Sequence, residues 1–92
     1  MRPEPVGDYV ITDHAFFEMK RRGISLRQVQ DVLESPEQRL HIRKDRHVLQ
    51  SQIEIEGSRY LIRVFVDVGR TPAEVVTAYL TSKIGRYWRE LP

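Results

Sequence analysis

The chain has 92 residues, a formal net charge of +2 and an isoelectric point near 9.2, with arginine dominating its basic residues. This length predicts a single domain over residues 1–92, with 1–8 as a flexible arm and 9–89 as the folded part. The absence of cysteine excludes disulfides and thiol chemistry. No apolar run approaches the ~20 residues that span a bilayer and the N-terminus has no signal-peptide pattern, so we expect a cytoplasmic protein with no membrane contact.

Two helices are expected first. The first begins at Thr12 or Asp13, since either residue can cap it, and ends at Gly23. Its apolar residues recur at helical spacing: Ala15, Phe16 and Met19. The second helix begins at Ser25, where Gln28 completes a capping box. Pro36 then stops it, so the two helices form a closely linked pair.

After Pro36 the apolar period changes from 3.6 to 2, which predicts strands. We expect four of them, over residues 39–43, 48–56, 59–67 and 74–81, with a two-residue turn at Gly57-Ser58. Ser82 is expected to cap a short helix over 83–90. The predicted fold class is α+β, with two N-terminal helices packed on a four-stranded antiparallel meander sheet and a short C-terminal helix.

Alternation divides the last two strands into two faces. The face expected to pack on the helices carries Tyr60, Ile62, Val64 and Val66, then Val76, Ala78 and Leu80. The other face is mixed and carries Leu61, Arg63, Phe65 and Asp67, then Val75, Thr77, Tyr79 and Thr81. Such a face is either a half-covered ligand groove or a surface capped by the C-terminal helix through Tyr87 and Trp88. Both interpretations stay open here.

His14 is the first chemical candidate, because a histidine at a helix start can exchange protons near neutral pH. The alternative is structural: His14 packs the helix start, and Glu18 pairs with Arg22 at i,i+4. His14 and Glu18 also have the i,i+4 spacing of metal ligands, but two ligands do not make a site. We therefore expect no metal and no cofactor.

Arg63 is the second candidate, because a mid-strand arginine is costly unless it is paired or binds an anion. The alternative is a salt bridge to an acid such as Glu54. Thr81 and Lys83 offer a hydroxyl, backbone N–H groups and an ammonium at a strand end, unless Ser82 simply caps the helix. Two basic stretches, 39–47 and 83–89, are candidate anion-binding surfaces or ordinary solvated ones.

Three segments carry a resemblance to a known family: residues 14–24, which begin His-Ala and end Arg-Gly-Ile; residues 60–67; and residues 74–84 with Tyr87-Trp88. In this order they resemble the domain-of-unknown-function family 4258, over about residues 9–89. That family is similar to the barnase–EndoU–colicin–RelE group of small metal-free ribonucleases, many of them toxins of toxin–antitoxin pairs. The resemblance implies a RelE-like fold. Members often carry basic residues where this chain has Glu18 and Leu80.

The resemblance implies a metal-independent endoribonuclease with RNA as substrate and an antitoxin protein as partner. It implies active residues at His14 and Arg22, and then at Arg63, Thr81 or Lys83. We expect His14, Arg22, Arg63 and Thr81 to be catalytic, and Arg21, Tyr79, Lys83 and Arg86 to bind RNA. The alternative is a non-catalytic RNA- or protein-binding module of the same fold, which needs the basic face but not the histidine.

Overall fold

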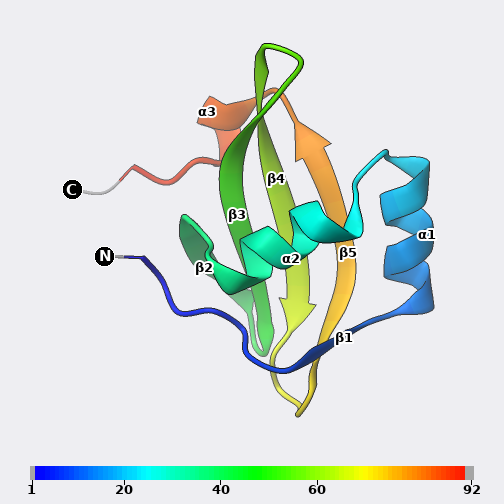
Figure 1. Ribbon diagram of the computed structural model, residues 1–92. Helices are drawn as coiled ribbons and strands as arrows, with labels where there is room; N and C mark the ends of the chain where they lie inside the picture. The colour runs from blue at the N-terminus through cyan, green and yellow to red at the C-terminus, as the bar shows by residue number, and fades with distance from the viewer. Residues whose placement is uncertain (1, 91–92) are drawn as a thin grey trace.

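The computed structural model describes residues 2–90 and confirms the α+β class (Figure 1). Its elements are β1 (Tyr9–Ile11), α1 (Asp13–Arg21), α2 (Leu26–Glu34), β2 (Gln38–Arg43), β3 (Arg46–Ile55), β4 (Ser58–Asp67), β5 (Ala73–Thr81) and α3 (Ile84–Tyr87). The sheet has five strands in the order β1-β5-β4-β3-β2. The predicted meander β2-β3-β4-β5 is present, but the four-stranded, wholly antiparallel sheet is wrong, because β1 adds a parallel strand beside β5.

Hydrogen bonds hold β1 beside β5, and the last of them involves Thr12, the residue before α1. The N–H of Ala73 donates to the carbonyl of Asp8 at 3.1 Å, and the N–H of Thr12 donates to the carbonyl of Val75 at 3.2 Å. The Thr12 hydroxyl donates to the same carbonyl and accepts the N–H of Ala15, each at 3.1 Å. Thr12 therefore ends the strand and caps the helix at once.

Local sequence explains where α1 and α2 begin and end. After α1 the backbone turns at Gly23, whose φ is +70°. The N–H of Ile24 donates to the carbonyl of Met19 at 2.8 Å, and that of Gly23 to Lys20 at 3.3 Å, which is a Schellman ending. α2 begins with the predicted capping box of Ser25 and Gln28.

Both helices cover one face of the sheet, but at different places. α1 lies beside β5, whereas α2 crosses β3 and β4 (Figure 1). Together they bury an apolar core whose sheet members are Leu49, Ile62, Val64, Val66, Ala73, Val75 and Ala78. No helix of residues 2–90 is long and apolar enough to cross a membrane.

The core face of β5 differs from the prediction. The pairing of β4 with β5 shifts by one residue, so that Phe65 lies opposite Thr77 while Val66 lies opposite Val75. Val76 is the extra residue of this bulge. Val75 consequently enters the core, where Val76 was expected, and Thr77, Tyr79 and Thr81 keep the opposite face.

Two turns also differ from the prediction. Ile55 pairs with Ser58, so the two-residue hairpin loop is Glu56-Gly57, both with positive φ, and not Gly57-Ser58. Helix α3 is shorter than expected, and the residue at its N-cap is Lys83, which makes no side-chain capping bond. The predicted cap by Ser82 is therefore wrong. The Thr81 hydroxyl accepts the N–H of Lys83 at 3.0 Å instead.

Candidate functional site

Arg63 lies in the middle of β4 on the face turned away from α1 and α2, and only 9% of it is exposed. Its Nε donates to Oε1 of Gln50 at 2.8 Å and its Nη1 donates to the Tyr79 hydroxyl at 2.7 Å. No carboxylate within residues 2–90 lies at salt-bridge distance from it. The alternative pairing with Glu54 is wrong, because the β3–β4 register sets Glu54 opposite Arg59.

Three aromatic rings surround this guanidinium. Its central carbon lies 4.4 Å from the ring centroid of Tyr87, 5.3 Å from Phe65 and 5.7 Å from Tyr79. The rings of Phe65 and Tyr79 are themselves stacked, 5.8 Å apart. The rings compensate the buried charge through cation–π attraction, which leaves it positive. We call Arg63, Gln50, Phe65, Tyr79 and Tyr87 the arginine cage.

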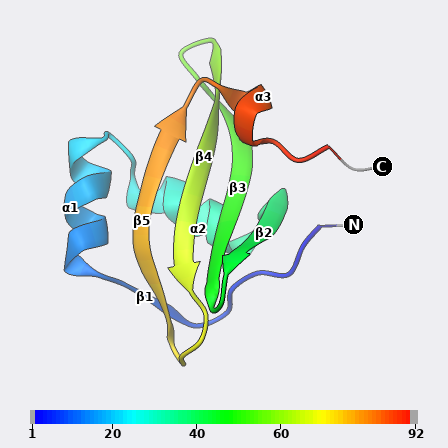
Figure 2. The same cartoon turned by 180° about the vertical axis from the view of Figure 1, so that it is seen from behind.

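Gln50 joins the arginine cage to the C-terminal segment. It is fully buried, and its Nε2 donates to Oε1 of Gln38 at 2.7 Å and to the carbonyl of Tyr87 at 3.1 Å. Gln38 in turn bonds both the N–H and the carbonyl of Arg89. These two amides hold residues 87–89 against the sheet, on the face that Figure 2 shows in front of α2.

A second group of polar residues lies along α1, and we call it the α1 cluster: His14, Glu18, Arg21 and Arg22. The Glu18 carboxylate lies 3.9 Å from Nε2 of His14 and 3.5 Å from Nη2 of Arg22, and it accepts hydrogen bonds from Arg21. The hydrogen bond from Arg21 lowers the pKa of Glu18, helped by the nearby positive charges and opposed by burial. The His14 side chain is 69% exposed, so the imidazole is open to solvent and to a ligand.

Arg22 connects the α1 cluster to the sheet. Its Nη1 donates to the carbonyl of Ala78 at 2.8 Å and to the Thr77 hydroxyl at 3.3 Å. β1 pairs with β5 only as far as Val75, so Arg22 covers the part of this edge that no strand covers. Thr77 lies opposite Phe65, which makes β5 the bridge between the α1 cluster and the arginine cage.

The remaining predicted residues lie at the end of β5 and on α3. Thr81 lies opposite Leu61, and its hydroxyl is bonded to the backbone of Lys83. Lys83 and Arg86 are exposed, and the guanidinium carbon of Arg86 lies 5.6 Å from the Tyr87 ring centroid. The predicted residues thus fall into two separate groups. His14, Arg21 and Arg22 lie at α1, whereas Arg63, Tyr79, Thr81, Lys83 and Arg86 lie on the other face of the sheet or beyond the end of β5.

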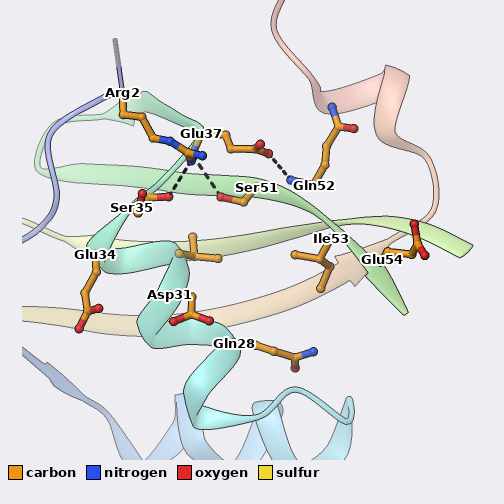
Figure 3. A pocket seen from close by; sticks show the side chains of 11 residues that line it. Arg2, Gln28, Asp31, Glu34, Ser35, Glu37, Ser51, Gln52, Ile53 and Glu54 are labelled. Carbon is orange, nitrogen blue, oxygen red and sulfur yellow. Dashed lines mark hydrogen bonds between the residues drawn. The ribbon is translucent and has the colours of Figure 1, made fainter. Parts of the chain in front are cut away.

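Three hollows in the surface lie elsewhere, and neither His14 nor Arg63 lines any of them. The hollow in Figure 3, about 410 Å³, lies between α2 and β3 and is rich in carboxylates from Asp31, Glu34, Glu37 and Glu54. In it the Glu37 carboxylate accepts the backbone N–H of Gln52 at 2.6 Å, beyond the end of β2. The other two hollows lie near the β2–β3 and β4–β5 turns and beside β1.

Gln50 and Phe65 are the members of this site that the sequence did not single out. A glutamine between Leu49 and Ser51 in a predicted strand is a usable signal, because a buried amide needs partners. Those partners come from β2, β4 and the C-terminal segment, which a single strand does not reveal. Residues 2–90 contain no group of three or more His, Cys, Asp or Glu placed to hold a metal ion.

Comparison with known proteins gives one match. A family model described as "Domain of unknown function (DUF4258)" matches residues 11–80, which include β5 up to Leu80, α1 and all of β4. No curated protein and no solved structure matches the chain significantly. The matched span carries His14, Arg22, Arg63 and Tyr79. On this match over most of its length, the chain belongs to the DUF4258 family.

Proposed function

We propose that this protein is a metal-independent endoribonuclease of the toxin–antitoxin type, acting in the cytoplasm on RNA and held by an antitoxin protein. The observation that carries the proposal is Arg63, a buried cation whose partners are all neutral. No carboxylate cancels its charge, and its Nη2 donates to no group of residues 2–90, so it can still attract a phosphate that reaches it. The rings around it offer stacking surfaces for bases. The resemblance to RelE-like ribonucleases supports the same conclusion.

In the proposed reaction the 2′-oxygen of a ribose attacks the neighbouring phosphorus, and the bond from phosphorus to the 5′-oxygen breaks. His14 takes the proton of the 2′-hydroxyl or gives a proton to the departing 5′-oxygen, and water carries out the other of these two proton transfers. Arg22, Arg63 and Lys83 stabilise the charge that grows on the phosphoryl oxygens. The products are a 2′,3′-cyclic phosphate and a 5′-hydroxyl.

The other predicted residues position the RNA. Thr81 or Tyr79 orients a phosphate oxygen, and the Tyr79 ring stacks on a base. Arg21 and Arg86, both exposed, contact flanking phosphates. Glu18, which lies 3.9 Å from His14, orients the imidazole in this scheme.

The test is cleavage of a single-stranded RNA by the purified protein, with the products resolved by mass. We expect cleavage that persists in EDTA and leaves cyclic phosphate ends. His14→Ala should lower the rate by about 10²–10⁴-fold, the usual contribution of a general acid or base. Arg27→Ala is the control, because that arginine pairs with Asp31 on the exposed side of α2. Loss of cleavage in EDTA, or full activity of His14→Ala, contradicts the mechanism.

A second candidate function is a non-catalytic RNA-binding module, and Glu18 is the observation that favours it. Its carboxylate pairs with Arg21 and Arg22 and so weakens their attraction for phosphate. Induced expression in bacteria separates the two functions. Growth arrest that His14→Ala and Arg63→Ala relieve supports the enzyme, whereas harmless expression with salt-sensitive RNA binding supports the module.

A further inference from the structure

A basic hollow lies between two turns of the sheet. These turns lie at the end of the sheet opposite α3 (Figure 2). The hollow measures about 480 Å³ and lies between the turn that joins β2 to β3 and the turn that joins β4 to β5. We call it the basic hollow, and its charged residues are Arg43, Lys44, Asp45, Arg46, Asp67 and Arg70. Neither His14 nor Arg63 belongs to it.

Two of its cations are left without an acid. Arg46 binds both carboxylate oxygens of Asp67, which lowers the pKa of Asp67 and raises that of Arg46. Arg70 pairs with Glu74 at 3.1 Å. Within residues 2–90, Arg43 and Lys44 have no carboxylate at salt-bridge distance. Both are exposed, so their charges are available to an anionic ligand.

The fold holds the two turns of the basic hollow together. The N–H of Val68 donates to the carbonyl of Asp45 at 2.8 Å. A Cβ built on Gly69 would lie 2.5 Å from Cγ of Asp45, so only glycine allows this close approach. The cations on one turn therefore keep a set position relative to those on the other.

The basic hollow and the arginine cage lie on the same face of the sheet. Arg63, Phe65 and Asp67 alternate along β4 and point to one side. Arg46 is paired with Asp67 and Arg43 with Arg46, so their side chains share this side. Asp67 is four residue steps along the strand from Arg63, a distance of about 13 Å at about 3.3 Å per residue. A single polynucleotide strand can reach both places.

We propose that the basic hollow binds the phosphate backbone of a single-stranded RNA whose neighbouring nucleotides lie along β4 and enter the arginine cage. This inference rests on the proposed function and adds the form of the substrate: an extended single strand of several nucleotides. An unpaired strand is required because the aromatic rings of the cage stack only on bases that are free of a duplex. A dinucleotide at the cage is too short to reach the basic hollow.

The test uses the double variant Arg43→Gln/Lys44→Gln and fluorescence anisotropy with two ligands, a single-stranded RNA of about twelve nucleotides and a dinucleotide. For the long RNA we expect the Kd to rise about tenfold at low salt. The slope of log K against log salt should fall by about 1.4, since each lost phosphate contact with a single strand removes about 0.7. Affinity for the dinucleotide should stay unchanged.

The matched control is Lys20→Gln/Arg27→Gln, which removes the same charge from the exposed surfaces of α1 and α2. Parent-like binding of the long RNA by the basic-hollow variant overturns this inference and leaves the proposed function standing. An equal loss in the control variant also overturns it, because the effect is then one of net charge. A parent protein that binds neither RNA overturns both proposals, as does binding only to an acidic protein. Equal binding of duplex RNA overturns the extended-strand form.

Discussion

Arg63 is a cation removed from water with only neutral groups in contact. An amide oxygen, a phenol and three rings replace its hydration. Burial of an unpaired charge is costly, so each of these contacts contributes to keeping the guanidinium in place. The contacts also leave its charge uncancelled, which an Asp or Glu partner would not do.

The hydroxyl of Tyr79 can be tested without removing its ring. Tyr79→Phe keeps the stack on Phe65 but leaves Nη1 of Arg63 without its acceptor. We expect the free energy of unfolding to fall by about 1–2 kcal/mol, the usual effect of losing a hydrogen bond to a charged group, measured by urea unfolding. The control is Tyr60→Phe, whose hydroxyl makes no hydrogen bond within residues 2–90. Equal effects of the two variants would show that the bond to Arg63 contributes nothing.

The ion pair of Arg46 and Asp67 predicts a pH dependence. The pKa of Asp67 is lowered in the folded protein by Arg46, so the pair stabilises the fold above the ordinary carboxyl pKa. That contribution disappears as the pH falls through the lowered value. Asp67→Asn should therefore lower the free energy of unfolding by about 0.5–1 kcal/mol at pH 7. The difference from the parent should narrow as the pH falls below the ordinary carboxyl pKa of about 4.

Urea unfolding at several pH values measures this narrowing. Asp31→Asn is the matched control, because its pair with Arg27 is largely exposed and surface pairs contribute little. A difference between Asp67→Asn and the parent that stays constant down to pH 2 would contradict the assignment.

At the residue scale, the sequence predicts that a mid-strand Arg63 is energetically costly unless it is paired, but it does not show which side chains form hydrogen bonds with it. Alternation placed Arg63 between Leu61 and Phe65 on the mixed face, and the structure keeps it there. Its acceptor Gln50 depends on the register between β3 and β4, which follows from the hairpin loop at Glu56-Gly57. The i,i+4 contacts within the α1 cluster were predictable, because helical spacing alone brings Glu18 and Arg22 together.

At the scale of elements, helix caps show which features depend on neighbouring residues in the sequence and which depend on the tertiary structure. Ser25 and Gln28 form their capping box within one turn of α2, as predicted. Ser82 does not cap α3, although the sequence around it offers the same chemistry. The hydroxyl of Thr81, the last residue of β5, accepts the N–H of Lys83. Thr81, and not Ser82, therefore stabilises the turn that leads into α3.

The two serines make a matched pair for mutation. Ser25→Ala should lower the free energy of unfolding by about 1 kcal/mol, the typical value of an N-cap. Ser82→Ala should change it by less than about 0.5 kcal/mol, as for other exposed positions. Thermal or urea unfolding of both variants measures the contrast. A larger loss for Ser82→Ala would mean that Ser82 caps α3 in solution.

Two features of the sheet could not be predicted from the sequence. β1 is only three residues long, which is too short to show an alternating apolar pattern. Its partner β5 lies more than sixty residues away in the sequence. The bulge at Val76 depends on how β5 pairs with β4. Two successive valines, Val75 and Val76, could each enter the core, and the position of the bulge decides for Val75.

At the scale of the whole molecule, the sheet is the middle of three layers. α1 and α2 lie on one side, and α3 with residues 88–89 lies on the other (Figures 1 and 2). The third layer is thin and is fastened mainly through the amides of Gln38 and Gln50. It is therefore expected to open more readily than the helical layer, because it has few apolar contacts.

Limited trypsin digestion can measure this opening, since Arg86 and Arg89 are cleavage sites within the third layer. Gln38→Ala removes both bonds to Arg89 and should speed cleavage at these sites about fivefold to tenfold, as expected for about 1 kcal/mol of lost hydrogen bonding. Gln30→Ala on α2, on the opposite side of the sheet from this segment, is the control. Unchanged cleavage in Gln38→Ala would mean that other contacts hold the layer.

The short edge strands β1 and β2 leave stretches of β5 and β3 unpaired, and a charged side chain bonds the backbone of each stretch. Glu37 accepts the N–H of Gln52 on β3, and Arg22 donates to the carbonyl of Ala78 on β5. Each takes a hydrogen-bonding position that a strand of another molecule would otherwise occupy. These two backbone positions are thereby closed to pairing with a strand of another molecule, and replacing either side chain with alanine would open its position while leaving the core intact.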